Sequence, residues 1–234
     1  MKSLRLQLGS EHLCGYLDDR LARSVFVDPA QAMTADLYSA LARKGFRRSG
    51  DLVYRPQCRG CTACTPVRLD VERYKPDRSQ RRNLQRNRDL RAEPKPPAFN
   101  EAHYRLFTRY QESRHGEGGM TGMSRRDYLG FLSSSWCSAN FVEFRDGDER
   151  LVGVAVVDRL RDGLSAVYTF YDPDAAARGI GTFAVQWQVA EAKRLRLPWL
   201  YLGYWIAESR KMAYKSRFRP LQALSGEDWE DVRE

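Results

Sequence analysis

The sequence predicts an α/β fold in which mixed, largely antiparallel sheets are flanked by helices. Three segments rich in β-branched and aromatic residues are separated by Asp-Gly pairs, as in consecutive hairpins: 140–145, 151–160 and 164–171. A glycine-containing loop, RGIGT at 178–182, then precedes a helical stretch at 183–196 and a further strand, PWLYLGYW. Strands and helices in this order favour sheets that are covered by helices.

Shorter elements are predicted in the first half of the chain. Alternation of apolar and polar residues and short extended runs indicate strands at 4–8, 12–17, 24–28, 46–49 and 51–56. Met33, Leu37 and Leu41 recur at four-residue steps, which is typical of one face of a helix. Gly45 is placed to end that helix.

A proline-rich stretch divides the chain. Residues 93–97, EPKPP, interrupt the periodic pattern and mark a connection. Helical spacing resumes at 99–113, and a second helix is predicted at 124–132. We therefore expect an N-terminal half at 1–95 and a C-terminal half at 96–234.

Length and composition fit one large domain or two small ones, because 42% of the 234 residues are hydrophobic. No run approaches the roughly 20 apolar residues of a membrane span, and the N-terminus MKSLRLQLGS lacks an apolar signal segment. We therefore predict a cytoplasmic protein with no membrane partner. The odd number of cysteines, five, argues against a disulfide framework.

The strongest local signal is a basic segment between residues 73 and 91. It carries eight Arg or Lys residues against two acids, in a chain whose formal net charge is +9. On a helix, one face holds Arg78, Arg81, Arg82, Gln85 and Arg88. Arginine forks suit phosphate, so this face predicts binding of nucleic acid; the alternative is a solvated charged surface.

A cysteine-rich loop is the second signal. Cys58, Cys61 and Cys64 form two overlapping C-x-x-C steps, a spacing that lets neighbouring thiolates reach one metal ion. In this interpretation Cys14 or His12 supplies a fourth ligand. We therefore predict a structural zinc or iron–sulfur site, and the alternative is that the thiols are small buried groups.

The order of elements in the second half is that of an acyltransferase domain of the GNAT type. Antiparallel hairpins lead to a glycine loop that opens a helix, and a strand and a short helix at about 207–215 follow. Amides at such a helix N-terminus can hold a phosphate. Gly179 and Gly181 fit a loop that binds coenzyme A, but its first position falls on Ala176, which argues against a small-molecule acetyltransferase.

Three long segments of the chain are distinctive: YRPQCRGCTACTPVRLDVERYKPDRSQRR, AVYTFYDPDAAARGIGT and LYLGYWIAESRKMAYKSRF. They closely resemble the bacterial aspartate/glutamate leucyltransferases, relatives of the eukaryotic arginyl-tRNA:protein transferases. The resemblance implies a duplicated GNAT-like fold. It also implies transfer of leucine from leucyl-tRNA to the N-terminal Asp or Glu of a protein, which marks that protein for degradation by the N-end rule.

The resemblance does not carry a metal site over unchanged. The arginyl enzymes have a C-x-x-C near the N-terminus and an adjacent cysteine pair later. In this chain Leu17 stands where the second cysteine of the first pair is expected after Cys14.

The implied reaction starts from an aminoacyl ester, which is already activated and requires no cofactor. The acceptor's α-amine has a pKa of about 8, so positioning carries much of the rate, with a proton acceptor and a proton donor beside it. We assign catalysis to Asp172, Tyr168, Tyr204 and Tyr214. Asp172, beside Tyr168, holds the ammonium or takes its proton, unless it is only a turn residue before Pro173. The hydroxyl candidates for protonating the leaving oxygen are Tyr201, Tyr204 and Tyr214, unless they are packing residues.

Binding residues are assigned in two groups. The residues expected to contact tRNA are Arg78, Arg81, Arg82, Gln85, Arg178 and Lys215. The residues expected to contact the acceptor are Tyr201, Arg210 and Lys211. Arg210, Lys211 and Lys215 could each pair with the acceptor's Asp or Glu side chain or with tRNA phosphate.

Two alternatives to leucine transfer remain from the sequence. One is an arginyl-tRNA:protein transferase, which differs only in the tRNA it uses. The other is a non-catalytic RNA-binding protein with a GNAT-like core, which predicts RNA affinity without transfer.

Overall fold

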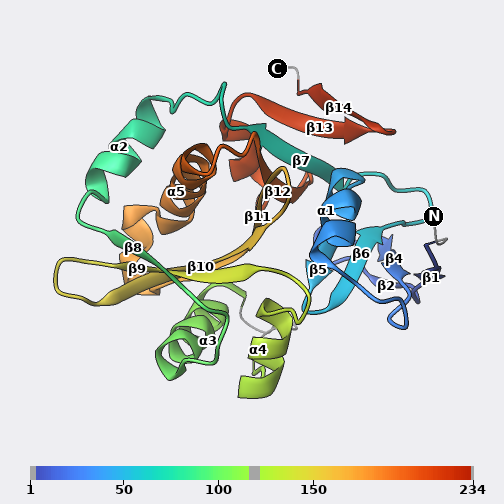
Figure 1. The fold of residues 1–234 in the computed structure, drawn as a ribbon, viewed down its shortest axis with the longest axis horizontal. Helices are drawn as coiled ribbons and strands as arrows, with labels where there is room; N and C mark the ends of the chain where they lie inside the picture. Colours follow the sequence, from blue (N-terminus) through green and yellow to red (C-terminus); the bar gives the residue numbers. More distant parts are fainter. Residues whose placement is uncertain (1–3, 116–121, 233–234) are drawn as a thin grey trace.

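Strands from both halves of the chain form a central eight-stranded sheet (Figure 1). The computed structural model describes residues 4–115 and 122–232. The strand order is β14-β13-β7-β12-β11-β10-β9-β8, and every neighbouring pair except β11 and β12 is antiparallel. The strands are β7 (Thr65–Asp70), β8 (Arg91–Lys95), β9 (Ala139–Arg145), β10 (Leu151–Arg159), β11 (Gly163–Tyr171), β12 (Trp199–Trp205), β13 (Leu221–Ser225) and β14 (Asp228–Asp231).

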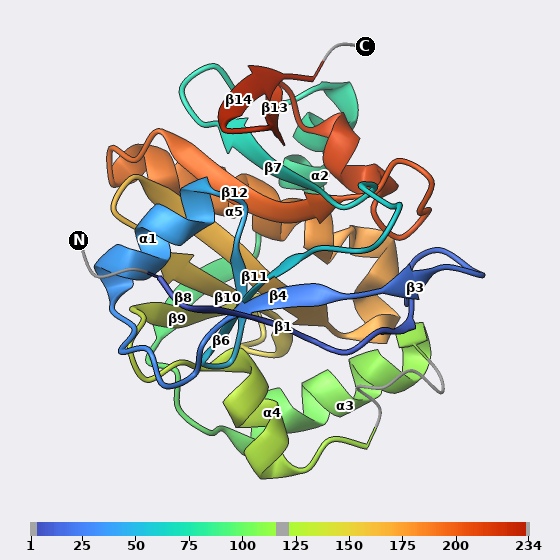
Figure 2. The same cartoon turned by 90° about the vertical axis from the view of Figure 1, so that its right-hand side faces the viewer.

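A smaller sheet has four strands in the order β1-β4-β6-β5 (Figure 2). Its strands are β1 (Leu6–Leu8), β4 (Ser24–Val27), β5 (Arg47–Ser49) and β6 (Leu52–Pro56), and a two-stranded ribbon joins β2 (His12–Leu13) to β3 (Leu21–Ala22). Helix α1 (Ala35–Arg43) begins after Thr34, whose side chain accepts a hydrogen bond from the Leu37 N–H. It connects β4 to β5.

Helices cover both faces of the large sheet (Figure 1). Helix α5 packs on one face with α2 beside it, and α3 packs on the other face with α4 nearby. The bounds are α2 (Arg78–Arg86), α3 (Glu101–His115), α4 (Arg125–Leu132) and α5 (Ile180–Arg194), with 3-10 helices η1 (Pro173–Arg178) and η2 (Ala213–Arg217). Apolar side chains alternate between the two faces of the strands, so each face has a core of its own.

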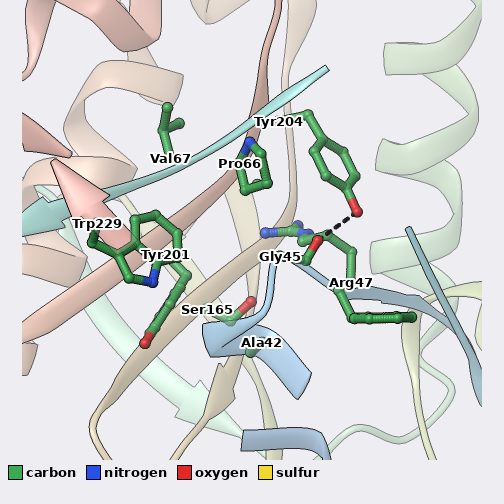
Figure 3. A pocket seen from close by; sticks show the side chains of 11 residues that line it. Ala42, Gly45, Arg47, Pro66, Val67, Ser165, Tyr201, Tyr204 and Trp229 are labelled. Carbon is green, nitrogen blue, oxygen red and sulfur yellow. Dashed lines mark hydrogen bonds between the residues drawn. The ribbon is translucent and has the colours of Figure 1, made fainter. Parts of the chain in front are cut away.

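A third core lies where α1 and the smaller sheet meet the large sheet. Tyr38, Leu41 and Val53 pack there with Leu160 and Tyr201. Figure 3 looks into this junction, which contains residues from α1, β5, β7 and β12. Side chains from distant parts of the sequence therefore meet at this point.

The predicted fold class is confirmed: a large mixed sheet, largely antiparallel, is flanked by helices. The hairpins β9-β10 and β10-β11 form as expected, and β12 follows α5 and pairs parallel to β11. None of the helices in the two described ranges is long and apolar enough to cross a membrane.

Several element boundaries differ from those predicted. Helix α5 begins at Ile180 rather than at residue 183, because Gly179 adopts a φ of 69° that ends η1 and starts the next helix. The expected strand at 12–17 is reduced to β2, and the expected helix at 207–215 is replaced by turns and η2.

The proline-rich stretch is also different from the prediction. Residues 91–95 form β8, an edge strand, where Pro94 is tolerated because one side of the strand needs no ladder hydrogen bond. Strands β7 and β8 lie within residues 1–95 and share one sheet with strands that follow. A division into halves at residue 95 stays a prediction.

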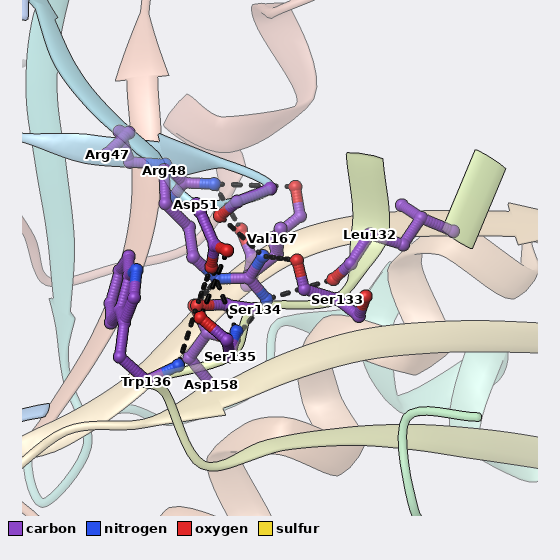
Figure 4. Close-up of polar contacts among 12 residues, drawn as sticks. Arg47, Arg48, Asp51, Leu132, Ser133, Ser134, Ser135, Trp136, Asp158 and Val167 are labelled. Carbon is purple, nitrogen blue, oxygen red and sulfur yellow. Dashed lines mark hydrogen bonds and ion pairs between the residues drawn. The ribbon is translucent and has the colours of Figure 1, made fainter. Parts of the chain in front are cut away.

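A buried ion pair joins the two sheets. The Arg48 guanidinium on β5 donates to Asp158 on β10 through Nε at 2.7 Å and Nη2 at 2.6 Å, and both side chains are 0% exposed (Figure 4). The same guanidinium donates to the carbonyls of Leu132 at 3.0 Å and Ser133 at 3.3 Å. One side chain therefore ties β5, β10 and the end of α4 together.

Replacing Arg48 by Met should lower the free energy of unfolding by about 3–5 kcal/mol, because Asp158 stays buried without its partner. Urea unfolding followed by circular dichroism measures this loss. Arg161→Met, which breaks an exposed pair with Asp36, is the control and should cost less than about 1 kcal/mol. Equal losses for both variants would contradict the role given to the buried pair.

Candidate active site

Strands β11 and β12 pair for only a short distance and then diverge. Their parallel pairing covers 163–165 and 199–201. Beyond it β11 continues along β10, while β12 continues along β7 with a register shift between Tyr201 and Gly203. Gly203 has a φ of 76°, which favours glycine. We call the opening between the strands after this point the wedge.

Arg47 on β5 reaches into the wedge (Figure 3). Its Nη2 donates to the carbonyl of Ala166 at 2.7 Å and to that of Val167 at 3.4 Å, both on β11. On the β12 side, a Cβ on Gly203 would lie 2.9 Å from the Arg47 Cζ. Nη1 is buried and has no hydrogen-bond partner within the described residues. The guanidinium therefore fills the space between the diverging strands.

Lys215 on η2 enters the same region. Its side chain is buried, with the residue 5% exposed, and its ammonium donates to the carbonyl of Tyr204 on β12. The pKa of Lys215 is lowered to about 7, first by burial and then by the charge of Arg47, while Cys64 opposes the shift. The structure thus places Lys215 inside the fold rather than on a surface that contacts tRNA phosphate.

Arg47 lies close enough to Tyr16, Tyr54, Tyr204 and Tyr214 for its charge to act on their pKa values. The pKa values are raised, first by burial, for Tyr16, Tyr54, Tyr110, Tyr168, Tyr204 and Tyr214. Arg47 acts on the pKa of both Tyr16 and Tyr214, so these rings lie near its charge. Tyr214 is 42% exposed, yet desolvation raises its pKa to about 12.

The tyrosine hydroxyls are not equivalent. Tyr168 accepts a hydrogen bond from Nε2 of Gln111 at 2.8 Å, which leaves its own proton available. Tyr204 already donates to the carbonyl of Gly45 at 2.8 Å. Raised pKa values keep these hydroxyls protonated at neutral pH. Tyr168 is therefore better placed than Tyr204 to donate a proton.

Asp172 has structural partners. Its Oδ1 accepts from Arg109 Nη2 at 3.0 Å and from the backbone N–H of Asp174 at 3.1 Å, which caps η1. The residue is buried at the end of β11. These contacts fit the turn interpretation of Asp172 and do not test its predicted catalytic role.

The predicted acceptor-binding residues separate into two places. Tyr201 is buried, donates to Asp162 at 3.0 Å and packs against Trp229. Its hydroxyl therefore has a partner in the core. Arg210 and Lys211 are exposed in the turns between β12 and η2, next to the segment that carries Lys215.

Helix α2 is attached to the glycine loop by amide side chains. A capping box of Asp77 and Gln80 starts the helix. Asn83 donates to the carbonyls of Arg178 at 2.8 Å and Gly179 at 3.0 Å. A Cβ on Gly179 would lie 2.7 Å from Asn83 Nδ2, so this side of the loop is covered by protein.

The opposite side of α2 presents the basic face that the sequence predicts. The exposed residues are Arg78, Arg81, Arg82 and Gln85 on the helix and Arg88 in the turn after it, because α2 ends at Arg86, before Arg88. Arg178, also expected to contact tRNA, instead donates to Asn87 at 3.0 Å and pairs with Asp89. The α2 face is available for an anionic partner, whereas Arg178 is occupied.

The cysteines lie near one another but do not form a metal site in the described residues. Burial raises the pKa of the Cys64 thiol to about 11, and Cys58, Cys14 and Cys61 add to the shift. All of these thiols are free. No group of three or more His, Cys, Asp and Glu residues in the described ranges is arranged to hold a metal ion. The zinc or iron–sulfur site stays a prediction.

Comparisons with known proteins identify the family. Models of the arginine-tRNA-protein transferase N terminus and C terminus match residues 12–82 and 102–225. An aspartate/glutamate leucyltransferase from Nitrosococcus oceani is 50% identical over 94% of this chain and 93% of its own. One from Thiobacillus denitrificans is 50% identical over 97% and 94%. The chain belongs to the aspartate/glutamate leucyltransferase family.

A more distant likeness concerns the fold. The C-terminal domain of a predicted lysylphosphatidylglycerol synthetase from Agrobacterium fabrum superposes with a TM-score of 0.51 and 13% identity. The match covers 83% of this chain and 62% of that one. At this identity only the architecture is shared.

Sequence reasoning missed several residues of the wedge in this leucyltransferase family member. Arg47, Tyr16 and Tyr54 come from the first 60 residues and meet β11 and β12 only in the tertiary structure. The available signal was the pair Arg47-Arg48 on a short alternating strand, because neighbouring side chains of a strand point to opposite faces.

The stability contribution of Lys215 should depend on pH. The pKa of Lys215 is about 7 in the folded state, below the ordinary 10.5. Below pH 7 the ammonium is charged in both states, so its burial lowers the unfolding free energy by the full amount. The penalty decreases as the pH rises. We expect the unfolding free energy of the wild type, relative to Lys215→Met, to increase by about 2 kcal/mol between pH 7 and 9.

Denaturant unfolding at several pH values measures this difference. Lys211→Met, in the exposed turn, is the matched control and should give a difference that does not change with pH. A constant difference for Lys215→Met as well would contradict the lowered pKa.

Proposed function

We propose that this protein transfers leucine from leucyl-tRNA to the N-terminal Asp or Glu of acceptor proteins and so marks them for N-end rule degradation in the cytoplasm. The observation that carries the proposal is the 50% identity to aspartate/glutamate leucyltransferases over nearly the whole chain. The wedge supports it, because the diverging strands bring two basic side chains, Arg47 and Lys215, together beside the backbone of β11 and β12.

The chemistry needs little from the protein beyond positioning and proton transfer. The acceptor's neutral α-amine attacks the ester carbonyl, an amide bond forms, and the bond to the ribose oxygen breaks. The amine loses one proton and the ribose oxygen gains one, so the reaction balances without ATP, coenzyme A or a redox partner. We therefore expect no cofactor in the reaction.

Tyr168 is our candidate for the proton donor to the ribose oxygen. Gln111 fills its acceptor position, and its raised pKa keeps the proton on the hydroxyl until the leaving oxygen needs it. Tyr214, at the exposed side of the wedge, is a second hydroxyl candidate. Asp172 remains the candidate for holding the attacking amine, subject to its bond with Arg109.

Tyr168→Phe should lower kcat by at least about 10²-fold, because it removes the donor and little volume. The variant should stay folded but lose about 1–3 kcal/mol of stability, because the buried Gln111 Nε2 loses its acceptor. Asp172→Asn, which weakens the bond to Arg109, is the comparison. Unchanged transfer by Tyr168→Phe would remove it from the mechanism, and unchanged transfer by Asp172→Asn would leave that residue with a capping role alone.

We propose that the exposed face of α2 binds tRNA phosphate. Arg81→Ala should reduce the slope of log affinity against log salt by about one, because one phosphate contact is lost. Filter binding of leucyl-tRNA at several salt concentrations measures the slope. Arg126→Ala, which removes an exposed arginine from α4, is the control. An unaltered slope for Arg81→Ala would move the tRNA site elsewhere.

The proposed function is tested by transfer of radiolabelled leucine from purified leucyl-tRNA to peptides that begin with Asp, Glu or Ala. We expect label on the Asp and Glu peptides only, without ATP or coenzyme A, and none from arginyl-tRNA in a parallel reaction. Label from arginyl-tRNA would assign the sister activity. Binding of tRNA without any transfer would favour an RNA-binding protein.

A further inference from the structure

Arg47 and Lys215 are two basic side chains in the wedge that have no carboxylate partner among the described residues. The hydrogen bonds of Arg47 go to the carbonyls of Ala166 and Val167, and Lys215 bonds to the carbonyl of Tyr204. The neighbouring Arg48 is different, because Asp158 neutralises it.

A buried cation without a counter-ion is costly. Lys215 is buried and Arg47 is half-buried beside it, and the charge of Arg47 opposes protonation of Lys215. Carbonyl dipoles offset part of this cost, but neither they nor the tyrosine hydroxyls carry a negative charge at neutral pH. The pair is therefore complementary to an anion that arrives from outside the chain.

The position of the pair indicates which anion fits. Lys215 is 5% exposed, and its ammonium lies 5.9 Å from the centre of the Tyr214 ring, which is 42% exposed. Only a narrow group can reach this depth, and a carboxylate at the end of a short side chain is such a group. The phosphates of a folded tRNA have a broad, exposed alternative in the arginines of α2.

We propose that Arg47 and Lys215 bind the side-chain carboxylate of the acceptor's N-terminal Asp or Glu, and that this contact selects acidic acceptors. The proposal rests on the proposed function and identifies the part of the site that reads the acceptor. Arg47 offers a planar fork and Lys215 a point charge, a combination that suits a carboxylate.

The surroundings hold Arg47 in place for this task. Ala166 fixes Nη2, and Gly203 lets the guanidinium lie against the backbone of β12. Nη1 keeps an unused donor. An N-terminal Asn has nearly the shape of Asp but no negative charge. We therefore expect Arg47 and Lys215 to bind an Asn-initiated peptide less tightly than an Asp-initiated one.

The experiment measures binding of Asp-initiated and Asn-initiated peptides of otherwise identical sequence to the full-length protein, without tRNA, and then kcat/KM for leucine transfer to each. The variants are Arg47→Gln and Lys215→Met. The control is Arg55→Gln, on neighbouring β6, whose guanidinium lies over the Phe46 ring and donates to the carbonyl of Lys44.

We expect the wild type to bind the Asp peptide at least about tenfold more tightly than the Asn peptide. This is the difference in affinity that one hydrogen bond to a charged group provides. The ratio should fall towards one in Arg47→Gln and in Lys215→Met and stay unchanged in Arg55→Gln. Arg47→Lys, which keeps the charge, should restore part of the preference. If Arg47→Gln does not fold, Arg47→Lys and Lys215→Met still test the pair.

Three results would overturn the proposal. Folded variants that keep the wild-type ratio would show that the carboxylate binds elsewhere. Equal losses for both peptides would show that the pair only supports the fold. Weaker tRNA binding with a smaller salt slope, and an unchanged peptide ratio, would assign the pair to a phosphate. Failure of the wild type to transfer leucine would instead count against the proposed function, because the peptide-binding ratio is measured without tRNA.

Discussion

The bond between Arg48 and Asp158 is the constraint on which the arrangement of the two sheets depends. Both side chains are fully buried, so the pair is stable only with both partners and with the carbonyls of Leu132 and Ser133 in position. The pair requires the side of β5 that carries Arg48 to face β10 of the large sheet. Because strand side chains alternate, Arg47 must then point the other way, into the wedge.

The wedge itself follows from the pairing of the strands. A parallel pair that ends at Ser165 and Tyr201 leaves two diverging strands whose backbone groups need other partners. Arg47 supplies donors to β11, and Lys215 supplies one to β12. The basic groups that complete the sheet are thus also the groups that we propose for acceptor recognition.

The two sides of helix α2 have different roles. Its amide side chains dock on the glycine loop, while its arginines stay exposed. This division places a basic surface beside the start of α5 and covers one side of the glycine loop. In the proposed function, the two substrates contact different groups. The exposed arginines of α2 bind tRNA phosphates, and Arg47 and Lys215 bind one carboxylate of the acceptor.

The sequence by itself determined the α/β class, the hairpins, the family and the exposed arginine face of α2, because local periodicity, turn residues and long motifs carry that information. It did not determine the wedge. Arg47 and Tyr168 are separated by more than 100 residues, and burial of Lys215 depends on how η2 packs against β12. Such contacts are decided only by tertiary packing, since neither charge nor residue type records which of several basic side chains the fold will bury.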